Sequence, residues 1–344
     1  MKPRLRRTIL CTLPLREAVL AEIRRQVRPL GVKHLVCRCG TDVDLGLDET
    51  VEILFTNYAP SQVEQAPHLR WLQLASAGIN HVMQSPIYER KDIRLTTGRG
   101  VYDVAGAEFT LGLMLSLIRN LPAAVDLQRR KEWCDNNDRL KLFLACELRG
   151  KTVGIVGYGG IGQEVARLSS AFGMRPSALI RKNKSARELR YRVPELRRLR
   201  RPPLENIFNF PNGLRPLLRR SDFLVITAPL TWETEGLIDD SALACMKPTA
   251  YLINVARGPI VKQDALIAAL REKRIAGAAL DVFPQEPLPP NSPLYALDNI
   301  IVTPHISGAF EDMFERASAL FVENFERYRA GKTLFNLVNR RRGY

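Results

Sequence analysis

Three short segments carry the residues best suited to chemistry: Arg257 in NVARGPI, Glu286 in ALDVFPQEPL and His305 in TPHISG. A histidine with an ordinary pKa of about 6.5 can protonate the alkoxide that forms when hydride adds to a ketone. A neighbouring carboxylate fixes one imidazole tautomer and favours the protonated ring, and an arginine can hold a substrate carboxylate and polarise a keto oxygen. We therefore predict Arg257, Glu286 and His305 as the catalytic residues. The chain has four histidines, and only His305 stands near a plausible glutamate partner.

A glycine-rich loop predicts the binding site of a dinucleotide cofactor. The run Gly157-Tyr158-Gly159-Gly160-Ile161-Gly162 matches G-x-G-x-x-G between a predicted strand at 151–156 and a predicted helix at 163–172. In this motif the first glycine allows a tight turn, the second lets the pyrophosphate approach the backbone, and the third lets the helix pack closely on the strand. The helix N-terminus then offers free N–H groups to the phosphates. The predicted cofactor ligands here are Gly157, Gly159, Gly160, Ile161 and Gly162.

The end of the next predicted strand bears on the choice of cofactor. In such a domain this strand normally ends in an acid that binds the ribose hydroxyls of NAD. Here the strand at 177–180 is followed by Arg181 and Lys182, with no acid. A cationic pair can bind a 2′-phosphate, so we predict that NADP(H) is favoured over NAD(H) and that Arg181 is a ligand. The alternative is that these residues only begin the basic segment 181–203.

The order of predicted elements indicates an α/β protein with two domains, as its 344 residues also suggest. Strands that alternate with helices predict parallel sheets covered on both faces. The predicted fold is two doubly wound parallel-sheet domains, with a Rossmann cofactor domain inserted in a flavodoxin-like substrate domain. The predicted substrate domain is discontinuous, 1–102 plus 310–344, and the predicted dinucleotide-binding domain is 103–309. The predicted strands are 8–13, 34–38, 51–57, 69–76, 93–97, 151–156, 177–180, 222–227, 250–255, 276–283 and 299–303.

Three further segments lead to expectations about packing. Residues 105–118 are apolar on almost every face, which predicts a buried helix at a domain or dimer interface. Apolar residues recur at helical spacing over 310–328, so this helix is predicted to pack back on the first domain. Segment 181–203 holds ten basic and two acidic residues. Such a charged stretch predicts an exposed loop or solvent helix, inserted in the dinucleotide domain.

Bulk composition narrows the function classes. The net charge is +15, which suits nucleic acid but equally suits an enzyme that attracts anionic substrates; we favour the enzyme. Six cysteines are present and only Cys37 and Cys39 are close, so no zinc-type spacing exists and no metal site is predicted. No apolar stretch reaches membrane-span length, and the basic start lacks a signal-peptide core. A cytoplasmic protein with reduced thiols is expected.

Taken together, the glycine loop and the segments around Arg257, Glu286 and His305 closely resemble the D-isomer-specific 2-hydroxyacid dehydrogenase family. The resemblance covers nearly the whole chain and is strongest over 151–308. It implies that Arg257 binds and activates the substrate, and that His305 is the acid/base whose partner is Glu286. It further implies that Asp281 contacts the nicotinamide carboxamide, that Ala228 and Pro229 pass under the cofactor, and that the backbone of Ser76, Ala77 and Gly78 holds the substrate carboxylate.

The implied activity is reduction of a small 2-keto acid, or oxidation of the matching D-2-hydroxy acid, by a homodimer. Within the family, glyoxylate/hydroxypyruvate reductases and short phosphoglycerate dehydrogenases fit best. Formate dehydrogenases fit less well, because they pair the histidine with glutamine where this chain has Glu286. One alternative is a nucleotide-sensing binding protein, similar to the C-terminal-binding co-repressors. Another is a nucleic-acid binder that uses residues 181–220. The chain departs from the family pattern in its missing ribose acid and its long basic segment.

Overall fold

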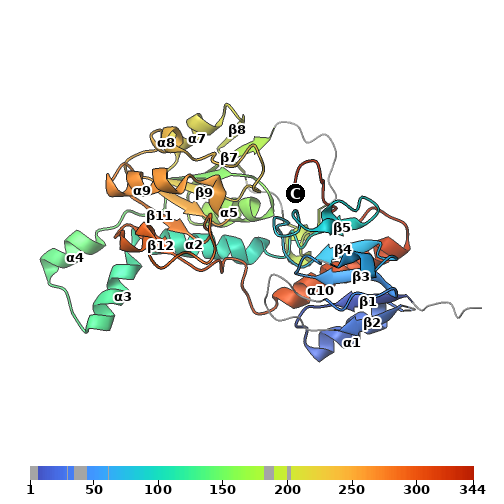
Figure 1. Ribbon diagram of the computed structural model, residues 1–344. Helices are drawn as coiled ribbons and strands as arrows, with labels where there is room; N and C mark the ends of the chain where they lie inside the picture. The colour runs from blue at the N-terminus through green and yellow to red at the C-terminus, as the bar shows by residue number, and fades with distance from the viewer. Residues whose placement is uncertain (1–6, 29, 35–44, 61, 182–189, 200–202) are drawn as a thin grey trace, which may run out of the picture. The chain divides into compact units, whose positions relative to one another are not determined.

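The computed structural model describes residues 7–28, 30–34, 45–60, 62–181, 190–199 and 203–344 (Figure 1). The chain divides into two compact units. Unit 1 comprises Met1–Tyr102, Ala186–Leu199 and Phe310–Tyr344. Unit 2 comprises Asp103–Ser185 and Arg200–Ala309. Each unit is built on its own parallel sheet, so the predicted α/β class with two parallel-sheet domains is confirmed.

The sheet of unit 1 has five parallel strands in the order β2-β1-β3-β4-β5. This is the flavodoxin-like order. Most positions in the central strands are apolar and buried, as expected of parallel strands covered on both faces. The strands are β1 Thr8–Cys11, β2 Gly31–His34, β3 Val51–Thr56, β4 Trp71–Leu74 and β5 Arg94–Thr96, and short 3-10 helices lie at η1 Val63–Gln65 and η2 Pro86–Tyr88.

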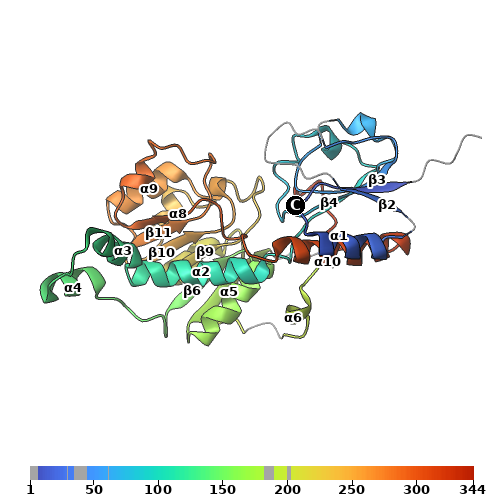
Figure 2. The same ribbon diagram turned by 90° about the horizontal axis from the view of Figure 1, so that it is seen from below.

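Two helices cover one face of this sheet, α1 (Glu17–Gln26) and α10 (Met313–Arg329) (Figure 2). The apolar stripe of α10 lies against the strands: the ring of Phe321 stacks on Phe55 at 4.5 Å between centroids and on Trp71 at 5.2 Å. All three rings are fully buried. The C-terminal helix therefore belongs to the core of unit 1, where the period of its apolar residues predicted it to pack.

The sheet of unit 2 has seven parallel strands in the order β12-β11-β10-β9-β6-β7-β8. Strand β6 lies between β7 and β9. The chain adds β7 and β8 on one side of β6 and then crosses to add β9 on the other side, so the strand order reverses between β6 and β9. Ligands of doubly wound sheets bind at this switch point, beyond the carboxyl ends of the strands. The strands are β6 Thr152–Val156, β7 Arg175–Arg181, β8 Asn206–Phe210, β9 Phe223–Ile226, β10 Tyr251–Asn254, β11 Gly277–Leu280 and β12 Ile300–Val302.

Helices cover both faces of the second sheet (Figures 1 and 2). One face carries α2 (Asp103–Ile118) and α5 (Gly160–Ala171). The other face carries α7 (Leu214–Arg220), α8 (Asp240–Leu243) and α9 (Gln263–Arg271), and 3-10 helices lie at η3 Gly258–Ile260 and η4 Pro293–Ala296. The apolar helix predicted at 105–118 is α2, and it packs within unit 2 against α5 and the sheet.

Helices α3 (Leu121–Arg130) and α4 (Asn136–Phe143) extend away from the sheet of unit 2 as an arm (Figure 1). No residue of either helix is fully buried against the parts of the chain that the structure describes, and Trp133 between them is 98% exposed. The arm also exposes Leu121, Val125, Leu140, Leu142 and Leu144. Among the described helices none is by itself long and apolar enough to span a membrane; α2 and α3 reach that length only as a pair bent by 68°.

The prediction of an exposed basic insertion in the dinucleotide domain is wrong for residues 190–199. This stretch groups with unit 1 and buries Tyr191, Val193 and Leu196, the last in the short helix α6 (Pro194–Arg197). The backbone N–H of Tyr191 donates to Asn336 Oδ1 at 3.0 Å. Three apolar side chains among the arginines are enough to anchor the segment, while most of the charged ends remain at the surface.

Candidate active site

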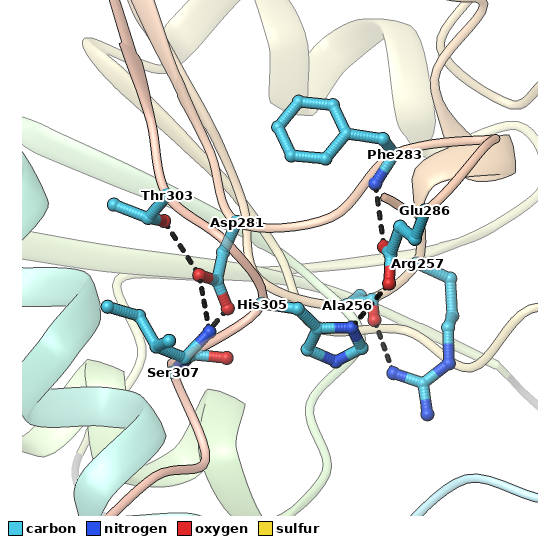
Figure 3. A network of polar contacts seen from close by, with 9 residues as sticks. Ala256, Arg257, Asp281, Phe283, Glu286, Thr303, His305 and Ser307 are labelled. Atoms are coloured by element: carbon cyan, nitrogen blue, oxygen red, sulfur yellow. Dashed lines mark hydrogen bonds and ion pairs between the residues drawn. The ribbon is translucent and has the colours of Figure 1, made fainter. Parts of the chain in front are cut away.

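The predicted catalytic residues come from the loops that follow three neighbouring strands of unit 2. Arg257 follows β10, Glu286 follows β11 and His305 follows β12. Because β10, β11 and β12 are adjacent and parallel, their carboxyl ends lie at one edge of the sheet. The structure brings the three side chains together there (Figure 3).

Glu286 and His305 form a hydrogen-bonded pair. His305 Nδ1 lies 2.7 Å from Glu286 Oε2, and the backbone N–H of Phe283 donates to Glu286 Oε1 at 2.9 Å. An ionised carboxylate only accepts hydrogen bonds, so Nδ1 carries the proton, and Nε2 has no protein partner among the described residues. The side chains are 45% and 35% exposed, which leaves Nε2 open to a small substrate.

The backbone of His305 adopts the left-handed conformation, with φ +54°. Non-glycine residues rarely adopt it, and at functional sites it costs on the order of 1–3 kcal/mol. The carboxylate of Asp281 holds the loop in this form, because it accepts hydrogen bonds from Thr303 Oγ1 at 2.6 Å and from the N–H groups of Ile306 and Ser307 at 2.9 and 2.8 Å. Asp281 is fully buried. Its predicted contact with a nicotinamide carboxamide remains a prediction.

The loop of Arg257 is fixed by a residue that the sequence did not single out. Asn254, at the end of β10, donates through Nδ2 to the Arg257 carbonyl and accepts from the Ala256 N–H, both at 3.0 Å. A Cβ on Gly258 would lie 1.9 Å from the carbonyl carbon of Phe283, so only glycine allows this loop to approach the loop of Glu286. An asparagine directly after a buried strand is the signal that could have indicated this clamp.

The guanidinium of Arg257 lies close enough to Glu286 to feel the charge of its carboxylate. Its Nη1 donates to the Ala256 carbonyl at 2.6 Å. Burial lowers the pKa of Arg257 below its usual value, and the charge of nearby Glu286 opposes that shift. Arginine stays protonated even so. The site thus holds a desolvated cation near the Glu286–His305 pair, an arrangement suited to binding and polarising an anionic carbonyl compound.

The glycine loop has the geometry that a dinucleotide requires. Gly157 has φ +96°, and a Cβ there would lie 2.6 Å from Ala228 Cα. A Cβ on Gly162 would lie 2.3 Å from the Gly157 carbonyl oxygen, which explains the close packing of α5 on β6. Gly159 precedes α5, and a Cβ there would point into open space. The loop therefore fits a pyrophosphate at the N-terminus of α5.

Two neighbours of this loop were not anticipated. A Cβ on Gly160 would lie 1.9 Å from a carboxylate oxygen of Asp103, so this glycine lets the buried start of α2 approach α5. Arg181, the last residue of β7, forms an ion pair with Glu233 on the loop after β9. That same loop also contains Ala228, which is buried, and Pro229, which is exposed.

The loop Ser76-Ala77-Gly78 belongs to unit 1, where it follows β4. Ser76 Oγ donates to the Gly78 carbonyl at 2.9 Å, and the Gly98 N–H donates to the Ser76 carbonyl at 2.8 Å. The hydroxyl of Tyr102 donates to the carbonyl of Ala75 at 2.9 Å. The turn is thus well fixed within unit 1. In neither unit do the described residues include a cluster of His, Cys, Asp or Glu that could hold a metal ion.

Comparison with known proteins identifies the family. The family model described as "D-isomer specific 2-hydroxyacid dehydrogenase, NAD binding domain" matches residues 111–307. The chain belongs to the D-isomer-specific 2-hydroxyacid dehydrogenase family. It is 38% identical over 292 residues to a glyoxylate reductase of Thermofilum pendens, covering 83% of this chain and 80% of that protein. With a glyoxylate reductase of Aeropyrum pernix it shares 40% over 284 residues, covering 81% and 78%.

Solved structures agree with this assignment. A D-isomer-specific 2-hydroxyacid dehydrogenase from Xanthobacter autotrophicus, in complex with NADPH and MES, superposes with a TM-score of 0.78 at 28% identity, covering 98% of this chain and 100% of that one. This dehydrogenase is therefore an oxidoreductase that acts on hydroxyacids and binds a nicotinamide dinucleotide. The predictions of family, fold class and reaction class are confirmed.

Proposed function

We propose that this dehydrogenase reduces a small 2-keto acid of the glyoxylate and hydroxypyruvate class, and oxidises the matching D-2-hydroxy acid. The contact of His305 Nδ1 with Glu286 Oε2 at 2.7 Å carries the proposal. It makes His305 a positioned acid/base whose second nitrogen is open, next to the cation of Arg257. The glyoxylate reductases among its relatives support a small substrate.

The nicotinamide, when bound, supplies the hydride that adds to the keto carbon. His305 donates the proton from Nε2 to the keto oxygen as negative charge develops there. Glu286 stabilises the imidazolium before transfer and keeps the proton on Nδ1 afterwards. Arg257 attracts the substrate carboxylate and polarises the carbonyl, and the backbone N–H groups of Ser76, Ala77 and Gly78 are proposed to bind that carboxylate.

For the cofactor, we propose that NADP(H) is preferred to NAD(H). The glycine loop from Gly157 to Gly162 would hold the pyrophosphate, and Ala228 and Pro229 would lie under the cofactor. Asp281 would bind the nicotinamide carboxamide. Arg181 supports the preference because it stands at the end of β7, where the domain places the adenosine ribose. An arginine at this place can bind a 2′-phosphate through charge-assisted hydrogen bonds.

We further propose that the chain forms a homodimer through the arm of α3 and α4. An exposed apolar group of this kind, rimmed by polar residues, marks an interaction surface, and closed symmetric dimers are the commonest assembly of such enzymes. The free thiols at Cys11, Cys134, Cys146 and Cys245 fit a reducing compartment such as the cytoplasm.

Oxidation of NADPH and NADH with a panel of 2-keto acids tests the proposed reaction. Glyoxylate, hydroxypyruvate, pyruvate and a bulkier 2-keto acid such as phenylpyruvate cover the size range. We expect turnover with one or more of the small acids, and the highest kcat/KM with NADPH. Tight cofactor binding without turnover of any of these acids would contradict the proposal.

A further inference from the structure

The ion pair of Arg181 with Glu233 lies at the end of β7 that faces the cofactor site in doubly wound domains. Arg181 Nη2 contacts Glu233 Oε2. The side chain of Arg181 is 37% exposed and that of Glu233 is 20% exposed, so the carboxylate is the more enclosed partner. Strands β7 and β9 lie on either side of β6, and the ion pair joins the end of β7 to the loop after β9.

The loop that carries Glu233 is held by hydrogen bonds that do not involve the Glu233 carboxylate. Thr234 Oγ1 donates to the Pro229 carbonyl at 2.7 Å and accepts from the Thr231 N–H at 2.8 Å. The N–H of Glu235 donates to the Thr231 carbonyl at 2.9 Å. These bonds close a tight turn around residue 233. The backbone position of Glu233 therefore follows from its neighbours, and this position puts its carboxylate within reach of Arg181.

Rossmann domains choose their cofactor at this strand end. An acid on the strand accepts hydrogen bonds from the ribose hydroxyls of NAD, whereas an arginine nearby accommodates the 2′-phosphate of NADP. In this chain both groups are present, but the strand contributes the arginine, and the acid comes from the loop after β9. Glu233 thus stands in for the ribose-binding acid that β7 lacks, and no motif in β7 indicates it.

We propose that Glu233 is a cofactor-selectivity residue, which holds Arg181 and opposes the binding of a 2′-phosphate. The inference deepens the proposed NADP(H) assignment and rests on it. A 2′-phosphate at Arg181 must share that cation with a carboxylate or displace it, and two negative groups about 5–6 Å apart repel each other. A ribose 2′-hydroxyl meets no such repulsion and can donate to the carboxylate. Arg181 therefore favours NADP(H), and Glu233 reduces that preference.

Calorimetric titration with two nucleotides, without any 2-keto acid, tests the proposal. The probes are 2′-phospho-ADP-ribose and ADP-ribose, which differ only in the 2′-phosphate. The isosteric Glu233→Gln variant should bind 2′-phospho-ADP-ribose about tenfold more tightly than wild type, a difference of about 1.4 kcal/mol, because the variant removes the repulsion between two near negative charges. It should bind ADP-ribose equally well or up to a few-fold more weakly.

Glu235→Gln is the matched control, because Glu235 lies two residues further on the same turn, is exposed, and the substitution changes the net charge equally. It should leave both affinities unchanged. In an Arg181→Ala background, Glu233→Gln should have a smaller effect, because no cation is left for the carboxylate and the phosphate to share. If Glu233→Gln binds both nucleotides as wild type does, the inference is overturned while the dehydrogenase assignment stands. If wild type binds neither nucleotide, the proposed cofactor site itself is wrong.

Discussion

Glu286 holds the ring of His305, and Asp281 holds the loop of His305 through the N–H groups of the next two residues, Ile306 and Ser307. The pairing of Glu286 with His305 could be predicted because hydride chemistry needs a proton donor, and a proton donor needs a partner that fixes its tautomer. The hydrogen bonds by which Asp281 fixes the loop could not be predicted, since they depend on which backbone N–H groups the fold brings close to its carboxylate. The roles of Arg257, Glu286 and His305 in turnover stay predictions.

Glu286→Gln should shift the pH dependence of 2-keto acid reduction. Reduction needs protonated His305, so the rate falls as the pH rises and the imidazolium loses its proton. The carboxylate stabilises the imidazolium and the amide does so less, so in the variant this fall occurs at lower pH. Profiles of kcat/KM against pH for the wild type and the Glu286→Gln variant measure this shift. Superimposable profiles would mean that the two side chains do not interact in the working enzyme.

Asp281→Ala should impair both stability and turnover. It leaves the N–H groups of Ile306 and Ser307 and the Thr303 hydroxyl without their buried acceptor. The donors are only part-buried, so each lost hydrogen bond costs about 0.5–1.5 kcal/mol, and the strained His305 loop can relax. We expect a lower midpoint of thermal unfolding and a kcat reduced by about tenfold or more. Asp298→Ala, at an exposed position before β12, is the control and should change neither.

At the scale of elements, the period of apolar residues predicted most of the buried strands and the long helices. It failed where an element is short or where charges surround a few apolar residues. Strand β8 alternates half-buried and exposed positions and was not predicted. The basic segment was predicted to be exposed, yet Tyr191, Val193 and Leu196 are buried. Composition alone does not show which side chains of such a segment pack against the rest of the chain.

Tyr191→Ala should destabilise unit 1. The ring is buried, meets Phe335 edge-on at 6.0 Å between centroids, and lies under the guanidinium of Arg197 at 5.3 Å. Removal of a large buried aromatic side chain costs about 3–5 kcal/mol. Chemical denaturation should show this loss in the transition that reports on unit 1. Arg198→Ala, at an exposed neighbouring position, should leave that transition where it is; an equal loss in both variants would mean that the segment is not anchored through Tyr191.

At the scale of the whole molecule, the strand orders of both sheets follow general rules for parallel α/β folds, so the architecture could be predicted. The identity of the 2-keto acid could not, because the walls of a substrate pocket come from loops that carry no motif. The arm of α3 and α4 was likewise missed, since none of its residues is fully buried and the period of apolar residues marks only helices that pack into a core.

Leu144→Glu should weaken the proposed dimer. Leu144 follows α4 and is 82% exposed, so its apolar side chain is available to a second copy of the arm. A charge buried unpaired in an interface is strongly unfavourable. Light scattering should give twice the 38.9 kDa chain mass for wild type and the single mass for the variant at low concentration. Leu199→Glu, at an exposed leucine of unit 1, should remain dimeric. A wild-type mass of 38.9 kDa would rule out the dimer.

The turnover of His305→Ala tests the proposed mechanism most directly. His305 is the only residue proposed to move a proton, and loss of a positioned acid lowers kcat by about 100-fold or more. The measurement is kcat for the best small 2-keto acid, with cofactor affinity determined separately, and His68→Ala in unit 1 serves as the control. We expect the His305 variant to bind cofactor as wild type does and to lose at least about 100-fold in kcat. Near-normal kcat in that variant would contradict the assignment of His305 as the acid/base.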